Sequence, residues 1–471
     1  MKVTKSGNLK HRKLQKEGYL QRVSAEQREY AGACASPRMT ETDITNTNEQ
    51  TEGLMERILA PDNLNKAFKQ VKRNKGAGGI DGMQVDELLP YLRENREELL
   101  QSLWDGTYRP KPVRRVEIPK ENGKVRKLGI PTVVDRLIQQ AISQILTPIY
   151  EEQFSDNSYG FRPKKSAHDA LKKCQANISE GYVYVVDMDL EKYFDTVNQS
   201  KLIQILSETI KDGRVISLIH RYLRAGIMVE GLFEESSEGV PQGGPLSPLL
   251  GNVMLNECDR ELDRRGHRFV RYADDMLIFC KSKRAAQRTF EHILPFLEQK
   301  LFLKVNREKT QVAYIRSTRF LGYGFYVYKG EGRLRVHPKS VQKLKDKIRE
   351  ITGRSNGWSI EHRRTRLNQV IRGWVNYFQL ADMKGLMQQL DKWTRSRIRM
   401  VTWKRWKRVR TRFANLQKLG VDEKKAWIWA NTRKSYWRIA HSPILTVTLS
   451  PDRFKRSGYL SFSECYLLTN V

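Results

Sequence analysis

The chain has few cysteines and no long apolar run. Its five cysteines lie far apart in 471 residues, and no two of them form a Cys-x-x-Cys pair. This spacing excludes a cysteine-rich zinc site and is typical of free thiols in a reducing compartment. No apolar segment approaches the roughly 20 residues of a membrane-spanning helix, and the polar, charged N-terminus does not resemble a signal peptide. We therefore expect a soluble cytoplasmic protein that binds neither zinc nor a membrane.

Acidic residues are also in deficit. The chain contains 53 Asp and Glu against 85 Lys and Arg, which gives a formal net charge of +32. An excess of this size indicates a polyanionic partner, and a solvated basic surface is the alternative. Eight of the nine tryptophans lie between Trp358 and Trp437, where the chain is also rich in basic residues. Basic residues that cluster with aromatic ones favour nucleic acid as the partner.

The length of the chain predicts more than one domain. Residues 1–50 are polar, which predicts a disordered N-terminal extension, and Met39 within it is an alternative start that the sequence leaves open. Strand and helix patterns alternate through residues 51–330, which predicts a mixed α/β part. Basic helical patterns follow over residues 331–430. The last segment, residues 431–471, is a basic tail that we expect to bind nucleic acid.

Two local patterns are clear in the N-terminal half. The segment Leu64–Asn74 has the pattern of a helix, which the glycine-rich turn "KGAGGIDG" ends. From Val113 onwards, "VRRVEIPKENGKVRKLGIPT" predicts a basic β-hairpin with Asn122 and Gly123 at its turn.

Two further segments predict strands that end in carboxylates. "YVYVVDMDL" is a nearly continuous apolar run that carries Asp187 and Asp189, which predicts a buried central strand. "RFVRYADDMLIFC" predicts a tight hairpin with Asp274 and Asp275 at its tip. If the two are neighbours in one sheet, their carboxylates repel one another unless a divalent cation binds, and hard oxygen ligands suit Mg²⁺. Taken alone, the Asp-Asp pair has a solvated hairpin tip as its alternative.

These segments are part of a longer, ordered series of motifs. "GKVRKLGIPTVVDRLIQQA" and "SYGFRPKKSAHDAL" come first, and "DLEKYFD", "GVPQGGPLSPLLGNVML", "RYADD", "LKVNREKT" and "RFLGYGF" follow in that order. Over residues 54–460 the chain resembles the bacterial group II intron reverse transcriptases and maturases. The resemblance implies an α+β fold of the right-hand polymerase type, with fingers and palm built on an antiparallel sheet. An α-helical thumb and maturase domain would follow.

The resemblance also implies a metal site. Two Mg²⁺ ions would be held there for an in-line phosphoryl displacement. The ligands would be three carboxylates and one backbone carbonyl, those of Asp189, Asp274, Asp275 and Leu190. Asp187 lies on the same strand face as Asp189 and is expected below the site. Asp195 matches the last acid of its motif and is expected to make a structural hydrogen bond.

A dNTP site is implied around the hairpin. Lys120 and Arg126 flank its turn and would reach the triphosphate, with Lys124 as a competitor for the role of Lys120. Phe194 stands five residues after Asp189, where an aromatic ring would pack under the sugar and exclude a 2′-hydroxyl. For Lys120 and Arg126, the alternative is a solvated basic hairpin. For Phe194, the alternative is ordinary core packing.

Two further nucleotide contacts are implied. Gln242, in "PQGGPLSP", would hydrogen-bond near the incoming nucleotide, and Gly243 and Gly244 would let the backbone approach the template pair closely. Lys309 would protonate the leaving pyrophosphate. For Gln242 and the two glycines, the alternative is an ordinary Pro/Gly loop before a helix. For Lys309, the alternative is an ordinary surface lysine.

The C-terminal half predicts a helical core with a basic surface. "RLNQVIRGWVNYFQLAD" resembles the maturase-specific domain of the family, and helical spacing predicts a core of Leu367, Ile371, Trp374 and Phe378. "KWTRSRIRMVTWKRWKRVRTRF" predicts one basic helix with an apolar stripe of Trp406, Val409 and Phe413 that lies along RNA phosphates. A solvated charged helix is the alternative. The predicted RNA contacts are Arg395, Arg399, Lys404, Arg405, Lys407 and Arg408.

The resemblance implies an RNA-directed DNA polymerase that uses Mg²⁺ and dNTPs. It would bind its intron RNA as template and splicing substrate, assist splicing, and use a DNA primer or target during retrohoming. One rival hypothesis is an RNA-binding splicing factor whose polymerase site has decayed, although the residues expected at an intact site are all retained, namely Asp189, Asp274, Asp275, Phe194 and Gln242. Another is an RNA-dependent RNA polymerase, against which Phe194 argues.

Many members of the family end in an HNH nuclease with a cysteine-pair zinc site. Only Cys465 lies near the end of this chain, so we expect no endonuclease activity. The primer would then come from elsewhere, such as a replication-fork strand. We expect a ribonucleoprotein in the bacterial cytoplasm, and the oligomeric state stays open.

Overall fold

The computed structural model describes residues 53–119 and 125–469. The predicted N-terminal extension at 1–50 and the predicted phosphate contacts Lys120 and Lys124 lie outside the described residues. None of the helices in the described part is both long and apolar enough to cross a lipid bilayer. The cysteines of this part are free thiols.

The described chain divides into two compact units, residues 53–315 and residues 316–469. The division falls before residue 330, where the sequence suggested a domain boundary. A physical reason is that Tyr323 packs on the C-terminal helices: its hydroxyl donates a hydrogen bond to the backbone carbonyl of Tyr377.

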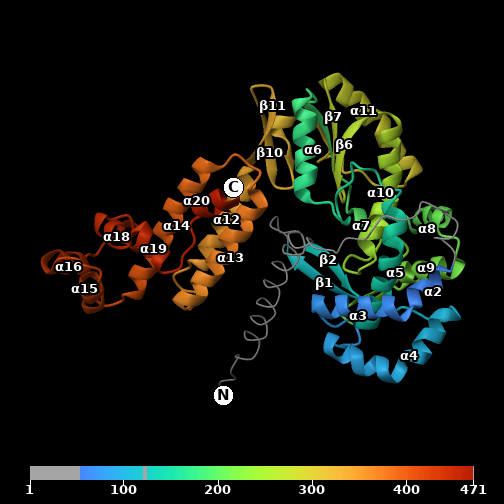
Figure 1. The fold of residues 1–471 in the computed structure, drawn as a ribbon, viewed down its shortest axis with the longest axis horizontal. Coiled ribbons are helices and arrows are strands. Elements are labelled where there is room, and N and C mark those ends of the chain that lie inside the picture. The colour runs from blue at the N-terminus through green and yellow to red at the C-terminus, as the bar shows by residue number, and fades with distance from the viewer. Residues whose placement is uncertain (1–52, 120–124, 470–471) are drawn as a thin grey trace, which may run out of the picture. The chain divides into compact units, whose positions relative to one another are not determined.

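Helices and one β-hairpin form the first part of unit 53–315 (Figure 1). Its central helix, α5, contacts α2 and α3, and 12 of its 19 residues are buried, as expected for a helix surrounded by protein. Thr132 caps this helix, because its hydroxyl accepts a hydrogen bond from the Asp135 backbone amide. The elements are α2 (Leu54–Leu59), α3 (Pro61–Asn74), a 3₁₀ turn (Val85–Glu87), α4 (Leu88–Trp104), β1 (Val113–Pro119), β2 (Val125–Ile130) and α5 (Val133–Glu151).

The helix and the pairing of the hairpin strands are confirmed, while the predicted turn at Asn122 and Gly123 lies outside the described residues. Helix α3 contains the predicted segment and begins three residues earlier, with Pro61 in its first turn, where proline needs no hydrogen-bond partner. It ends where Lys75 adopts a left-handed conformation, just before the glycines. Strands β1 and β2 pair antiparallel from Arg114 opposite Ile130 onwards.

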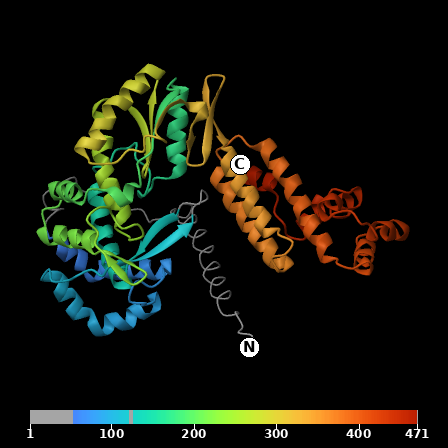
Figure 2. The same cartoon turned by 180° about the vertical axis from the view of Figure 1, so that it is seen from behind.

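An antiparallel sheet with the strand order β6-β7-β3-β8 organises the rest of this unit. Helices α6, α10 and α11 pack against it, and Val185, Val186, Leu277 and Ile278 are fully buried. Figure 2 shows the same arrangement from behind. The elements are α6 (Ala167–Ser179), β3 (Tyr184–Met188), α7 (Tyr193–Thr196), α8 (Gln199–Thr209), α9 (Gly213–Arg224), β4 (Ile227–Val229), β5 (Leu232–Glu234), α10 (Ser247–Arg264), β6 (Arg268–Tyr272), β7 (Asp275–Cys280), α11 (Lys283–Pro295), a π-helical turn (Phe296–Lys300) and β8 (Gln311–Tyr314).

Unit 316–469 is mainly helical and begins with a small sheet of order β11-β10-β9. The mixed α/β fold with antiparallel sheets and a helical C-terminal region is therefore confirmed. The elements are a 3₁₀ turn (Ile315–Ser317), β9 (Arg319–Phe320), β10 (Tyr323–Tyr328), β11 (Glu331–Val336), α12 (Pro338–Ile351), α13 (Ile360–Phe378), α14 (Lys384–Arg405), α15 (Val409–Lys418), α16 (Glu423–Ala430), α17 (Tyr436–Ala440), α18 (Pro443–Thr448), α19 (Pro451–Arg456) and α20 (Phe462–Thr469).

The predicted core of α13 is confirmed. Leu367, Ile371 and Phe378 are buried, and Trp374 is half-buried against Phe378 at 4.7 Å between ring centroids. Helix α20 contacts both α13 and α14.

The prediction of one continuous basic helix from Lys392 to Phe413 is wrong. Helix α14 ends at Arg405, and α15 begins at Val409, which is exposed rather than part of an apolar stripe. The break is held by side chains: the Trp406 ring meets Trp403 edge to face at 5.7 Å, and Arg412 donates a hydrogen bond to the Trp406 carbonyl. Packing of the two tryptophans has outweighed the helical pattern of the segment.

A buried carboxylate on α14 fixes the start of α20. Asp391 accepts hydrogen bonds from the backbone amides of Phe462 and Ser463, at 2.8 and 3.1 Å, and from the Ser461 hydroxyl at 2.8 Å. Helix ends need such acceptors, so this side chain both caps α20 and attaches it to α14.

We predict that Asp391→Ala destabilises unit 316–469 by about 1–3 kcal/mol, because two backbone amides at the start of α20, one of them buried, lose their acceptor. Chemical denaturation followed by circular dichroism measures the change. The control is Asp452→Ala, which removes an exposed acid from the first turn of α19 and should cost about 0.5 kcal/mol or less. Equal stability of the two variants would contradict the capping role.

Candidate active site

Strand pairing places the two segments that carry the predicted carboxylates side by side. β3 pairs antiparallel with β7, with Asp187 opposite Leu277 and Met188 opposite Met276. Asp189 directly follows β3 and Asp275 is the first residue of β7, so both lie at the same end of this ladder. The expectation that the two segments are neighbours in one sheet is therefore confirmed.

The tip of the β6–β7 hairpin is held in a strained conformation. Tyr272 pairs with Asp275, so Ala273 and Asp274 form the turn, and Ala273 has a φ of 56°. A left-handed conformation is costly for a residue other than glycine and needs support from its surroundings. Gly160 lies directly against this turn, since a Cβ atom there would be 2.3 Å from the Ala273 nitrogen.

That support comes from a buried arginine. Arg271 is fully buried, and its guanidinium donates to the Ala273 carbonyl at 3.0 Å and to Asn252 Oδ1 at 2.9 Å. The same guanidinium donates from Nε to both oxygens of the buried Asp259, at 2.8 and 2.9 Å. A buried charge must be paired in this way, and the pair ties the turn to helix α10. Arg271 and Asp259 were not predicted from the sequence, where the only signal is an arginine in the interior of an otherwise apolar strand.

The pKa values of the carboxyl groups at this sheet edge depend on the charges of their acidic neighbours. Burial raises the pKa of the Asp274 carboxyl, and the charge of Asp189 adds to the rise, while Arg126 opposes it. Burial likewise raises the pKa of Asp187 to about 6, again with a contribution from Asp189. Each negative charge therefore costs free energy here, and a bound cation would remove that cost.

Lys309 lies within this site. The Lys309 Nζ is 2.8 Å from Oδ2 of Asp189. Lys309 follows a turn in which the backbone amide of Asn306 donates a hydrogen bond to the Asp189 carbonyl at 2.9 Å. The Thr310 hydroxyl accepts a hydrogen bond from the Asp189 backbone amide at 3.1 Å. The segment after the π-helical turn thus fixes both the backbone and the side chain of Asp189.

The donor set at this edge has the chemistry of a magnesium site. Asp189 and Asp274 offer hard oxygen ligands, and the raised pKa of Asp274 favours a bound cation. Within the described ranges, however, no three His, Cys, Asp or Glu side chains gather closely enough to hold a metal ion. A cation bound by Asp189 would have to displace the Lys309 ammonium group.

Two predicted nucleotide contacts lie together beside the carboxylates. Arg126 Nε, on β2, donates to Gln242 Oε1 at 3.1 Å, and Gln242 Nε2 donates to Asp195 at 3.3 Å. Asp195 thus makes the hydrogen bond expected of it. Gly243 has a φ of 122°, and a Cβ atom there would lie 2.5 Å from the Gly129 carbonyl oxygen, so only glycine fits this approach of two backbones.

The Phe194 ring is fixed by packing. It meets Tyr193 edge to face at 5.1 Å, and a Cβ atom at Gly251 of α10 would lie 3.0 Å from its Cε1. Phe194 is half-buried and packs against the core of this unit. This placement suits both a sugar-contacting ring and a core residue, and the steric-gate role stays a prediction.

The predicted RNA contacts separate into accessible and inaccessible residues. Arg399 is corrected: it is buried, and its guanidinium donates to the Leu449 carbonyl at 2.9 Å, so it attaches α14 to the C-terminal helices instead of facing solvent. Lys404 is half-buried and donates to the Arg354 carbonyl at 2.9 Å. The remaining predicted contacts are half-buried or exposed, namely Arg395, Arg405, Lys407 and Arg408.

We predict that Arg271→Lys lowers the free energy of unfolding of unit 53–315 by about 2 kcal/mol, because lysine keeps the charge but cannot reach Asp259, Asn252 and Ala273 together. Urea denaturation followed by circular dichroism measures it. Arg268→Lys is the matched control on the same strand, since its ion pair with Glu180 is exposed and worth little. If both variants unfold at the wild-type midpoint, the buried network does not hold the turn.

Family models match two segments of the chain. One describes reverse transcriptases (RNA-dependent DNA polymerases) and matches residues 118–325. The other describes the group II intron maturase-specific domain and matches residues 341–420.

Among solved structures, a partial Cas6-RT-Cas1–Cas2 complex matches with a TM-score of 0.35 and 23% identity, over 56% of this chain and 46% of that chain. Telomerase from Candida albicans matches with a TM-score of 0.39 and 14% identity, over 62% of this chain and 59% of that chain.

Curated relatives match over most of the chain. The group II intron-encoded protein LtrA of Lactococcus lactis is 31% identical over 439 residues, which cover 73% of each chain. The protein YkfC of Escherichia coli is 34% identical over 311 residues, which cover 58% of this chain and 82% of the relative. The chain therefore belongs to the family of group II intron-encoded proteins, in which a reverse transcriptase domain is followed by a maturase-specific domain.

Proposed function

We propose that this reverse transcriptase and maturase is a Mg²⁺-dependent RNA-directed DNA polymerase whose catalytic carboxylates are Asp189, Asp274 and Asp275. The pairing of β3 with β7, which joins Asp189 to the Asp274–Asp275 turn, is the observation that carries the proposal. Two Mg²⁺ ions held by these carboxylates and the Leu190 carbonyl would activate the primer 3′-hydroxyl and stabilise the leaving pyrophosphate. The raised pKa of Asp274 supports a cation at this place.

The residues beside the carboxylates would bind the incoming dNTP. Arg126 now donates to Gln242, and on nucleotide binding its planar guanidinium would turn to the triphosphate, for which it is well shaped. Gln242 would then be free to contact the nucleotide. Lys120 remains a proposed phosphate contact. Lys309 would release Asp189 and deliver its proton to the pyrophosphate oxygen.

Phe194 would act as the steric gate. Its ring is held in place by Tyr193 and Gly251, so it cannot easily move aside for a 2′-hydroxyl. A rigid ring is what discrimination by exclusion requires.

The maturase part would bind the intron RNA, as template and as splicing substrate, and the chain would use a DNA primer or target during retrohoming. Exposed cations at the break between α14 and α15 support this, with Arg405, Lys407 and Arg408 foremost. Contacts to phosphates release counterions, so this binding should weaken steeply as salt rises. The complex would act as a ribonucleoprotein in the bacterial cytoplasm.

We predict that the protein extends an oligo(dT) primer on poly(rA) with Mg²⁺ and dTTP, and that Asp274→Asn lowers the rate at least about 100-fold, because one metal ligand is lost. Asp156→Asn is the control, since that side chain is 99% exposed and pairs with Lys165. Activity that survives Asp274→Asn would place the site elsewhere. Tight intron binding without any extension by the wild type would support the rival, a splicing factor with a decayed site.

We predict that Phe194→Ala lowers the preference for dTTP over UTP about tenfold or more, because the ring no longer meets the 2′-hydroxyl. The ratio of kcat/KM values for the two nucleotides measures this independently of any loss of folded protein. Phe194→Tyr keeps the ring and should keep the preference. An unchanged ratio in Phe194→Ala would assign the ring to core packing alone.

A further inference from the structure

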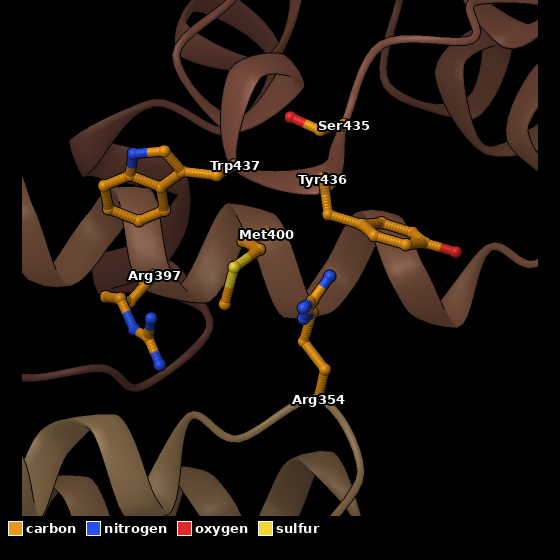
Figure 3. A pocket seen from close by; sticks show the side chains of 6 residues that line it. All are labelled: Arg354, Arg397, Met400, Ser435, Tyr436 and Trp437. Atoms are coloured by element: carbon orange, nitrogen blue, oxygen red, sulfur yellow. The ribbon is translucent and has the colours of Figure 1, made fainter.

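A cavity of about 430 Å³ opens within unit 316–469 (Figure 3). It lies between α14, α17 and the segment that follows α12, and its volume is in the range of small-molecule sites. Its lining residues are two arginines, two aromatic residues, a methionine and a serine, namely Arg354, Arg397, Met400, Ser435, Tyr436 and Trp437. The sequence-based search for RNA contacts found none of these six.

Two arginine–aromatic pairs bound the cavity. The Arg354 guanidinium lies over the Tyr436 ring at 5.3 Å from the centroid, and Arg397 lies over Trp437 at 6.0 Å. Figure 3 shows one pair on each side of Met400, whose thioether lies between them. Trp437 is 41% exposed, so solvent or a ligand reaches its ring. The cavity thus offers flat apolar faces and cations within one small volume.

Among the described residues, neither Arg354 nor Arg397 forms an ion pair with an acidic side chain, and the nearby Asp346 pairs with Arg349 instead. Within the described part of the chain, the hydrogen bonds of the Arg397 guanidinium end on neutral oxygens: the Thr352 hydroxyl at 2.9 Å, and the Arg349 and Thr352 carbonyls. Burial lowers the pKa of Arg397, and the charges of Arg349 and Arg354 lower it further. Cations that repel one another in this way favour an anionic ligand.

The combination matches an unpaired nucleotide. A base has two flat faces that stack on aromatic rings, and the phosphates on either side of it carry the negative charge that the arginines need. A base within a duplex is stacked on its neighbours and cannot enter such a cavity, whereas single-stranded loops present bases that can.

We propose that this cavity binds one unpaired nucleotide of a single-stranded RNA, with the base against Met400 between Tyr436 and Trp437 and the flanking phosphates on Arg354 and Arg397. The proposal rests on the proposed RNA binding of the maturase part and gives it a defined subsite. Ser435, at the rim, supplies a hydroxyl for one edge of the base.

The first experiment is photo-crosslinking of the full chain to a 12-nucleotide single-stranded RNA that carries 5-iodouridine. A saturating, fully paired RNA–DNA hybrid occupies the polymerase site during the reaction. We expect crosslinked peptides that contain Tyr436 or Trp437. Crosslinks confined to other peptides would overturn the proposal.

The second experiment measures affinity for the same RNA under the same conditions. Trp437→Ala should weaken binding about tenfold, the effect of losing one base–aromatic stack, while Trp437→Phe should restore most of it. The matched control is Trp427→Ala on α16, a 56% exposed tryptophan outside the cavity, which should bind like the wild type. Equal affinities of Trp437→Ala and Trp427→Ala would contradict the proposal.

The third experiment tests the phosphate contact. Arg354→Gln should reduce the slope of log affinity against log salt by about 0.7, the value for one phosphate on a single strand. An unchanged slope would remove Arg354 from the site. Primer extension by the wild type on oligo(dT)–poly(rA) is measured alongside, so failure of the subsite and failure of the polymerase assignment are distinguishable.

Discussion

The antiparallel pairing of β3 with β7 places the carboxylates on which the proposed chemistry depends. Asp189 follows one strand and Asp274 precedes the other, so their proximity depends on the register of this single ladder. A shift of one residue would turn every side chain of β3 to the opposite face of the sheet. The adjacent Val185 and Val186 point to opposite faces and are both fully buried, as are Leu277 and Ile278, so such a shift would force the cores on both faces of the sheet to repack. Core packing and site geometry are therefore set by the same pairing.

The site carries free-energy costs that the surrounding structure must offset. Burial and mutual repulsion raise the pKa values of Asp187 and Asp274, and Ala273 is held in a left-handed conformation. The buried Arg271–Asp259 pair supports the turn between β6 and β7. The Lys309 ammonium group forms an ion pair with the Asp189 carboxylate. Local strain and crowded charge are common at functional sites, and here they coincide at one sheet edge.

Much of the fold could be predicted from the sequence, because local patterns agreed with tertiary packing. The apolar run before Asp189 became a central strand, and the helical spacing of Leu367, Ile371 and Phe378 became a core. Patterns failed where tertiary contacts outweighed them, as at Trp406, whose packing against Trp403 ends α14.

Only part of the candidate site could be predicted from the sequence. Its acids follow from motif and spacing, but a sequence does not say which arginines are buried. Arg399 therefore looked like an RNA contact, although its partner is the Leu449 carbonyl, 50 residues away. Arg271 and the cavity around Trp437 stayed hidden for the same reason, since their partners come from distant segments.

The most direct test of the central claim is the number of divalent ions bound at this sheet edge. Mn²⁺ can replace Mg²⁺ as a paramagnetic probe, and electron paramagnetic resonance counts bound ions in the complex with primer, template and dTTP. The account predicts two bound ions in the wild type and loss of at least one in Asp189→Asn. Unchanged stoichiometry and affinity in that variant would contradict it.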